Sequence, residues 1–153
     1  MKLRIEIDPE RPEEIVIYAR EITDDLRRIQ NAVGSVLSKD GELALKNGDS
    51  EFYLPYAEVL FFETAENRVW AHTAKDCFSC PLHLHELEDL LPHAFARASK
   101  CCVVNTAKIK SLKRSPTGIA EAAFYGTEKK IYISRMYYKP VRTIIEETRL
   151  NQQ

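Results

Sequence analysis

The sequence has no apolar run that approaches the roughly 18 residues of a membrane-spanning helix. Its N-terminus, MKLRIEIDPERPEE, carries acidic residues where a secretory signal peptide needs an apolar core. Internal repeats, low-complexity segments and Gly/Ser-rich linkers are also missing. These absences predict one cytoplasmic domain with a small appendage at most. With 153 residues, 44% of them hydrophobic, the chain is large enough to bury a core.

Cysteine is scarce, with four residues in two close pairs, Cys77/Cys80 and Cys101/Cys102. A chain without an export signal is expected to keep its thiols reduced. In the second pair we expect Cys102 to behave as a small buried apolar residue. Cys101 is expected to be exposed beside a loop, where a redox switch is the alternative reading although only Lys100 would lower its pKa.

The segment CFSCPLHLH raises the alternative of a zinc site, because Cys77, Cys80, His83 and His85 are potential ligands. A structural zinc site needs four converging ligands, however, and this segment reads as a strand followed by the start of a helix. We therefore expect packing roles for these residues, and neither a metal nor another cofactor.

Motifs of the common enzyme classes are also missing. No P-loop, GxSxG or HExxH pattern occurs. Acidic residues gather in the N-terminal third and in the segment 86–89, where a solvated helix face explains them. His72 reads as a satisfied strand residue, and Trp70, Phe61 and Phe62 as core and sheet packing. An enzyme is not expected.

Acidic residues are almost missing from one block of the chain. Residues 1–96 hold 10 Lys and Arg against 19 Asp and Glu, whereas residues 97–142 hold 11 against 2. The net charge of −1 therefore hides two opposed halves. A basic block opposed only by Glu121 and Glu128 indicates contacts with an anionic partner such as the phosphates of nucleic acid, and a solvated basic face is the alternative.

The first forty residues predict a small strand-strand-helix element. LRIEI and EEIVIYA alternate apolar and polar residues on either side of DPERPEE, whose two prolines suit a connection. From Ile22 the apolar period changes to that of an amphipathic helix ending near residues 34–38. An element this small is not stable alone, so residues 1–42 are expected to pack on the rest of the chain or on a second copy.

Residues 43–153 predict a second unit, mainly of antiparallel strands. Strands are expected in ELALKN, EFYLP, AEVLFFETA, NRVWAHTA, DCFSCPL, FARA, CCVV, KIKSLKRS, IAEAAFY and KKIYI. Two helices are expected, one in LHELEDLLPHAF and one that Ser134 caps and that runs from Arg135 past Ile145. Between the strands FARA and CCVV we expect an exposed loop with Ser99 and Lys100, able to reach a partner.

Three of these segments together resemble the LytTR family of bacterial DNA-binding domains. They are LPYAEVLFFETAENRVWAHT, PLHLHELEDLLPHAFARASKCCVVNTAKIKSL and KKIYISRMYYKPV, in the order and spacing of the family. The resemblance covers about 100 residues and is specific, because three motifs in register seldom coincide. It implies a mainly β (α+β) fold, elongated and antiparallel with short helices, here preceded by the N-terminal ββα element.

The resemblance also implies a transcriptional regulator that inserts basic loops into successive major grooves of promoter repeats. Its DNA-contacting positions match nine residues here: Asn67, Arg68, Arg97, Ser99, Lys100, Cys101, Ser134, Arg135 and Lys139. Asn67, Lys100 and Arg135 are expected at base edges, and Arg97 and Ser99 at phosphates. Many family members carry two consecutive arginines where this chain has Arg135 and Met136, so the second base contact does not carry over.

The segment before the match is too short for the receiver domain that many family members carry. We expect a dimerisation element instead, and hence a homodimer on paired double-stranded DNA sites without membrane insertion. Two alternatives remain open: an interaction module that uses the basic face on an acidic protein, and a small metal-binding or enzymatic domain. A steep salt dependence of DNA binding separates the first hypothesis from the second.

Overall fold

The computed structural model describes residues 2–37 and 41–150. Within these residues the helices are α1 (Asp24–Leu37), α2 (Leu84–Leu90) and α3 (Arg135–Leu150), with short 3-10 turns η1 (Tyr56–Glu58) and η2 (Thr106–Lys108). The strands are β1 (Glu42–Asn47), β2 (Ser50–Pro55), β3 (Phe61–Ala65), β4 (Arg68–His72), β5 (Cys77–Cys80), β6 (Phe95–Ser99), β7 (Cys102–Asn105), β8 (Ile109–Arg114), β9 (Ala120–Phe124) and β10 (Lys130–Ile133).

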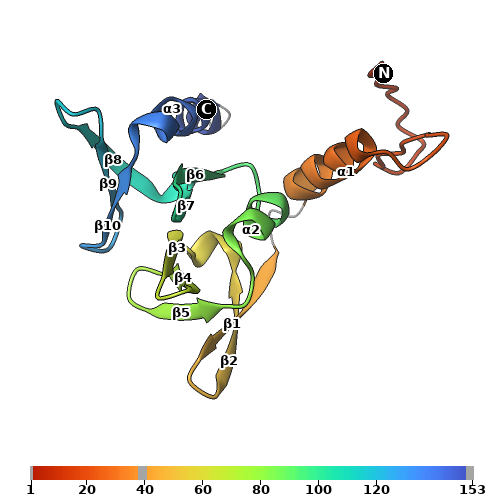
Figure 1. Cartoon of the computed structure of the whole chain (residues 1–153). Coiled ribbons are helices and arrows are strands. Elements are labelled where there is room, and N and C mark those ends of the chain that lie inside the picture. Colours follow the sequence, from red (N-terminus) through yellow and green to blue (C-terminus); the bar gives the residue numbers. More distant parts are fainter. Residues whose placement is uncertain (1, 38–40, 151–153) are drawn as a thin grey trace.

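The strands form two antiparallel sheets (Figure 1). The larger has the order β2-β1-β5-β4-β3-β7-β6 and the smaller the order β10-β9-β8. In Figure 1 the β1–β2 hairpin lies at one end of the molecule and the small sheet with α3 at the other. The mainly β fold with short helices and the helix beginning at residue 135 are thus confirmed.

The large sheet is covered on both faces, as neighbouring residues of its central strands show. Successive side chains of a strand point to opposite faces. Accordingly, Phe61 and Val104 belong to one buried cluster, while their neighbours Phe62 and Val103 belong to the other. Strand β7 is buried at every position, as expected for a strand with both faces covered.

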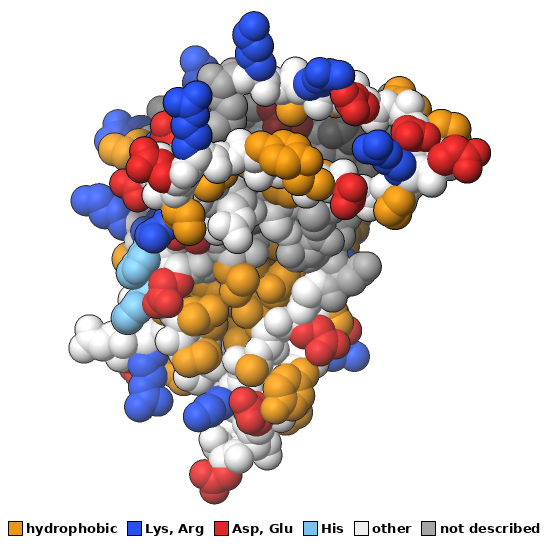
Figure 2. Space-filling model, turned by 90° about the vertical axis from the view of Figure 1, so that its right-hand side faces the viewer, with side chains coloured by type: hydrophobic (Ala, Val, Ile, Leu, Met, Phe, Trp, Pro, Cys, Tyr) orange, Lys and Arg blue, Asp and Glu red, His pale blue; other side chains and the backbone are white. Residues whose placement is uncertain are grey.

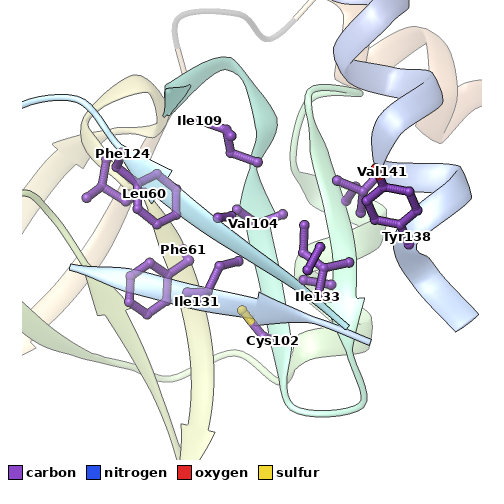
Figure 3. Packing of buried hydrophobic residues seen from close by; sticks show 14 residues of the cluster. Leu60, Phe61, Cys102, Val104, Ile109, Phe124, Ile131, Ile133, Tyr138 and Val141 are labelled. Carbon is purple, nitrogen blue, oxygen red and sulfur yellow. The ribbon is translucent and has the colours of Figure 1, made fainter. Parts of the chain in front are cut away.

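The first cluster joins the two sheets and α3 (Figure 3). Phe61 from β3, Phe124 from β9 and Ile131 from β10 meet there, and Tyr138 and Val141 close it from α3. The second cluster lies on the other face of the large sheet, where Leu84 and Leu87 of α2 pack against it. The β6–β7 hairpin is held between these clusters, which fixes the position of its turn.

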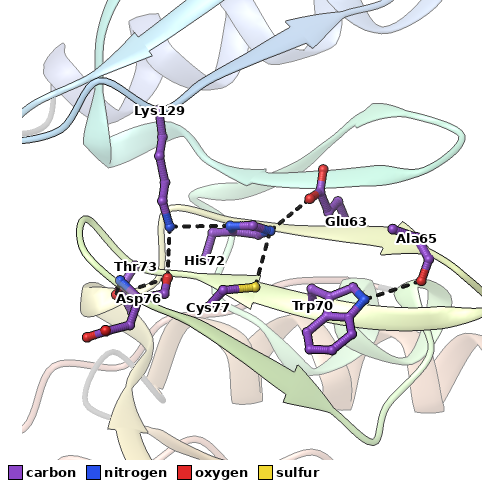
Figure 4. A network of polar contacts seen from close by, with 8 residues as sticks. All are labelled: Glu63, Ala65, Trp70, His72, Thr73, Asp76, Cys77 and Lys129. Carbon is purple, nitrogen blue, oxygen red and sulfur yellow. Dashed lines mark hydrogen bonds and ion pairs between the residues drawn. The ribbon is translucent and has the colours of Figure 1, made fainter. Parts of the chain in front are cut away.

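A polar cluster also bridges the sheets (Figure 4). Lys129, just before β10, donates from Nζ to the backbone oxygen of Asp76 at 2.8 Å and to Nδ1 of His72 at 3.4 Å. Because Nδ1 accepts, the ring proton sits on Nε2, which donates to Oε1 of Glu63 at 2.8 Å. Burial lowers the pKa of His72, Lys129 lowers it further, and Glu63 opposes this shift. We conclude that His72 is a neutral structural residue.

The N-terminal element differs from the sequence-based expectation. Helix α1 is present and contacts α2, but residues 2–23 contain no paired strand in the single chain. Figure 1 shows this segment extending away from the sheets beside α1. The two predicted strands are unpaired here, and an isolated hairpin of two short strands is only marginally stable in water. Helix α1 ends at Leu37, inside the predicted range 34–38, of which only residue 38 lies outside the described residues.

Candidate nucleic-acid interface

The turn between β3 and β4 presents Asn67 and Arg68. It is a two-residue hairpin turn in which both central residues have positive φ, 54° at Glu66 and 61° at Asn67. This conformation is type I′, which matches strand twist and accepts Asn readily. The side chains of Asn67 and Arg68 are exposed at the tip. A rigid hairpin therefore projects an amide and a guanidinium into solvent.

The turn between β6 and β7 presents Ser99, Lys100 and Cys101. Lys100 and Cys101 are exposed, and the backbone N–H of Cys101 donates to Oγ of Ser99 at 3.2 Å. A register shift between Arg97 and Ser99 marks a bulge in β6, and bulges of this kind often redirect side chains near functional sites. The expected loop is therefore confirmed, with the strand reaching one residue further, to Ser99.

Strand pairing brings the two turns to the same edge of the sheet. Strand β3 runs antiparallel to β7, with Glu63 opposite Cys102. The last residues of β3 therefore lie beside the first residues of β7, and the N–H of Thr64 donates to the carbonyl of Cys101 at 2.9 Å. The end of β5 reaches this edge too, because Cys80 pairs with Val69.

A cleft of about 530 Å³ opens where these turns meet the segment that enters α2. Its walls are formed by Thr64, Asn67, Arg68, Val69, Ser79, Cys80, Pro81, Leu82, His83, Leu84, His85, Arg97 and Lys100. Three of these side chains are cations, and none is an Asp or Glu. The cleft is thus locally basic although most of its lining comes from the acidic half of the sequence, and it suits an anionic ligand.

Arg97 is the most constrained cation of the cleft. Its Nε lies 3.2 Å from Oε1 of Glu88 on α2, and its side chain is 25% exposed. Nη1 of the same guanidinium is buried and has no hydrogen-bond partner within the described residues. Such a donor is costly to leave unsatisfied. The ion pair with Glu88 and the burial of Nη1 together hold the guanidinium against α2.

The third predicted group, at the start of α3, lies outside this cleft. The N–H of Ser134 donates to the carbonyl of Ala98 at 2.9 Å, which places the helix start beside β6. Arg135 and Lys139 are exposed on the first turns. A Cβ at Gly118 would lie 2.8 Å from Cδ of Arg135, so the arginine stem rests against the glycine turn after β8. The nine residues therefore form two groups joined through β6.

Two histidines of the cleft that can donate hydrogen bonds were not predicted as site residues. His83 and His85 line it, and their rings stack with centroids 5.6 Å apart. Sequence reasoning considered them only as zinc ligands. His83 is the N-cap of α2 and His85 lies in its first turn, so strand alternation does not place them together, and no local sequence signal predicted their position in the cleft. Imidazole N–H groups can donate hydrogen bonds to an anion here.

The cysteines have separate structural roles. Cys77 and Cys80 are three residues apart in β5, so their side chains lie on opposite faces, Cys77 exposed and Cys80 buried. Among the described residues no group of three or more His, Cys, Asp or Glu side chains could hold a metal ion. Cys102 is buried in the core, as predicted, and its burial raises its pKa to about 12, while Cys101 is exposed in the turn.

The fold and the cleft define a β domain with a basic, turn-built recognition edge. Comparison with family models matches residues 49–146 to the LytTr DNA-binding domain. The chain belongs to this family. A solved structure, the LytTr DNA-binding domain of a putative methyl-accepting/DNA response regulator from Bacillus cereus, has the same fold. It aligns with a TM-score of 0.64 and 20% identity over 69% of this chain and 96% of the other.

The chain also resembles proteins of Staphylococcus aureus named uncharacterized HTH-type transcriptional regulators. Those of strains NCTC 8325 and COL are each 30% identical to it over 143 residues, which covers 93% of this chain and 96% of theirs. Because the family match begins only at residue 49, this similarity includes most of the N-terminal segment. In the described residues, no helix combines the length and the apolar character that crossing a membrane requires.

Proposed function

We propose that the chain is a sequence-specific transcriptional regulator that binds double-stranded DNA with its turn-built cleft. The observation that carries the proposal is the convergence of Arg68, Arg97 and Lys100 in a cleft that no Asp or Glu lines, although Arg97 is also paired with Glu88 of α2. The family assignment supports the same class of ligand. The DNA backbone supplies phosphate oxygens at regular spacing, which suits cations held on rigid elements.

In the proposed mechanism, some residues position the protein on the DNA backbone and others recognise the bases. Arg97, whose side chain is 25% exposed, and Ser99 bind phosphate oxygens. Asn67 and Lys100, at the tips of two adjacent turns, enter a major groove and contact base edges, where an amide can pair with adenine and an ammonium with guanine. Arg68 and Cys101 flank them at the groove walls.

The start of α3 forms the second point of contact. Arg135 reads a base edge, and Ser134 and Lys139 bind the backbone beside it. The hydrogen bond from Ser134 to Ala98 sets the spacing between this group and the β6–β7 turn. Two contact points on one rigid framework fit successive segments of a duplex, and two copies of the chain on paired sites would double them.

An acidic protein is the alternative partner, favoured by the basic residues of β8 to β10 outside the cleft, such as Lys110 and Lys113. The two partners differ in how affinity depends on salt. Binding to a duplex releases condensed counterions, so log K falls linearly with log salt at about 0.9 per neutralised phosphate. An acidic protein has no comparable atmosphere.

The function is tested by a fluorescence-anisotropy titration of the full chain against labelled duplexes at several salt concentrations. We expect affinity for duplex DNA with a salt slope that corresponds to several phosphates. A competing acidic polypeptide such as polyglutamate should displace the duplex only at much higher charge concentration. Undetectable duplex binding at low salt, together with tight binding of the acidic competitor, would support the alternative partner instead.

A further inference from the structure

The N-terminal segment exposes several large apolar side chains that a folded single chain would usually bury. Leu3, Ile5 and Ile7 are 92%, 79% and 94% exposed, and Ile15 and Tyr18 also lie in solvent. Figure 2 views the side of the molecule that carries α1 and this segment, and hydrophobic side chains are interleaved there with acidic and basic ones. Contiguous exposed apolar residues of this kind mark an interaction site.

The residues 2–8, KLRIEID, have a pattern that is complementary to itself. In an extended strand Leu3, Ile5 and Ile7 share one face. The other face carries two cations followed by two anions, Lys2, Arg4, Glu6 and Asp8. A strand that is basic in its first half and acidic in its second half matches a copy of itself running in the opposite direction.

We propose that two copies of this chain dimerise by antiparallel pairing of residues 2–8 about a twofold axis through Ile5. In this register Leu3 lies opposite Ile7 of the second copy, and Arg4 opposite Glu6. Lys2 then lies opposite Asp8. Oppositely charged residues that face each other directly stabilise an antiparallel pair, and like charges destabilise it. The same patch serves both copies, as a twofold interface requires.

The single chain already shows the charge preference on which the pairing depends. Arg4 and Glu6 form an ion pair within the segment, with side chains 82% and 62% exposed. An exposed pair of this kind contributes little. In the dimer, Arg4 of each copy pairs with Glu6 of the other copy in place of Glu6 of its own chain, so every charge keeps an opposite partner. A partner of uniform charge would satisfy only half of the strand, and this favours a second copy.

A pair of short strands alone is marginal in water, and the chain offers a flanking strand. Residues 15–19 alternate with Ile15 and Ile17 on one face, and DPERPEE connects them to the first strand. Each copy can therefore add residues 15–19 to the outer edge of its own strand 3–7. The result is a four-stranded antiparallel sheet with Leu3, Ile5 and Ile7 of both copies at its centre, which meets the usual requirement of three or more strands.

Charge exchange tests the register. In sedimentation-velocity experiments over a concentration series, the full chain should dimerise, and Arg4→Glu or Glu6→Arg alone should raise the dimer dissociation constant about tenfold or more. The double variant should recover the wild-type constant, because positions 4 and 6 would again carry opposite charges across the axis. An equimolar mixture of the two single variants should form heterodimers as tight as the wild-type dimer, since both cross-axis pairs are again complementary.

A cysteine experiment tests the position of the axis independently. With exposed Cys77 and Cys101 replaced by Ser, Ile5→Cys should crosslink to its own copy under mild oxidation. Leu3→Cys is the matched control, because position 3 lies opposite Ile7 and is separated from position 3 of the second copy by roughly 13 Å along the strands. Circular dichroism should show the same β signal for all variants, since residues 2–8 lie outside both core clusters.

Three outcomes would overturn the proposal. The first is a wild-type chain that stays monomeric at hundreds of micromolar, which leaves the segment to another partner or to pairing within the chain. The second is a dimer whose dissociation constant the single charge changes leave unaltered. The third is a weakened dimer that neither the double variant nor the mixture restores. None of these measurements uses DNA, so their failure would be distinct from failure of the proposed function.

Discussion

At the scale of single residues, a substitution of Lys100 distinguishes a base-specific contact from general electrostatic affinity for DNA. Lys100 lies at the tip of the β6–β7 turn beside Arg68 and Arg97 in a cleft that no Asp or Glu lines. Replacing it with Ala removes one charge and the contact proposed at a base edge. We expect Lys100→Ala to weaken binding to a selected duplex by about 1–3 kcal/mol and to relax the preference at one base position.

The matched control for this change is Lys75→Ala. Lys75 is exposed in the turn after β4, at the opposite end of that strand from Arg68. The Lys75→Ala variant loses the same charge but keeps the cleft intact. Its affinities for selected and scrambled duplexes, measured by anisotropy titration, should therefore differ little from those of the wild type. Equal losses for Lys100→Ala on both duplexes would argue against base reading by this residue.

His72 makes a second prediction at this scale, one about stability. Burial lowers its pKa in the folded chain below the ordinary value near 6.5. In the pH interval between the lowered and the ordinary pKa, the unfolded chain binds the proton more readily. The contribution of neutral His72 is therefore fully present above about pH 6.5 and is lost as the pH falls toward the lowered pKa.

The variant His72→Gln removes this titration but keeps a donor for Glu63. At pH 7 it should cost about 1–3 kcal/mol, because the contact with Lys129 is lost. The difference in unfolding free energy between wild type and variant should shrink from pH 7 to pH 5 in urea denaturation. A difference that stays constant over this range would show that His72 titrates alike in both states.

The residue scale also shows where sequence reasoning succeeded. Cys102 was predicted to be apolar and buried because it begins a short hydrophobic strand after an exposed turn, and the structure confirms this. His83 and His85 were missed as site residues. Their position in the cleft depends on how β5 delivers the chain to α2, and no local pattern reveals which surface a connecting segment will face.

At the scale of elements, the DNA contact proposed for α3 differs in kind from those proposed for the turns. Its first residue, Arg135, rests against Gly118, while Lys139 is exposed one turn later and outside the cleft. A lysine that contacts only phosphate contributes equally on every sequence. We expect Lys139→Ala to weaken binding to all duplexes alike and to reduce the salt slope by about one.

The control for Lys139→Ala is the neighbouring surface position Thr143→Ala, one further turn along α3 and also exposed. It should change neither affinity nor slope. Salt titrations on a selected and a scrambled duplex measure both quantities together. A loss confined to the selected duplex would reassign Lys139 to base reading and would contradict the backbone role proposed for it.

Elements were predictable where local signals were strong. Alternating residues bounded by turn sequences such as KNGDS and GTEK marked the strands from β1 to β10, and the period of Leu84 and Leu87 marked α2. The N-terminal strands show the limit of this reasoning. Alternation shows only that a segment prefers the extended conformation. A strand forms when other strands complete its hydrogen bonds and cover its apolar face, and residues 2–8 are unpaired in the single chain.

At the scale of the whole molecule, long-range pairing creates the candidate site. The turns carrying Asn67 and Lys100 are far apart in the sequence, and they meet only because β3 pairs with β7 in antiparallel register. The charge count along the chain predicted the nature of the ligand, but not this convergence. The resemblance to the LytTR family, since confirmed by the match over residues 49–146, assigned residues of both turns to contact with one DNA duplex.

The most direct measurement of the central claim is selection of bound duplexes from a random pool, run in parallel with wild type and with a variant carrying Asn67→Ala and Lys100→Ala. The account predicts an enriched motif for wild type and the loss of base preference for the variant, with residual binding to all duplexes through Arg97 and Lys139. A wild-type pool without any enriched motif, or the same motif enriched by both proteins, would contradict the assignment of base reading to these two turns.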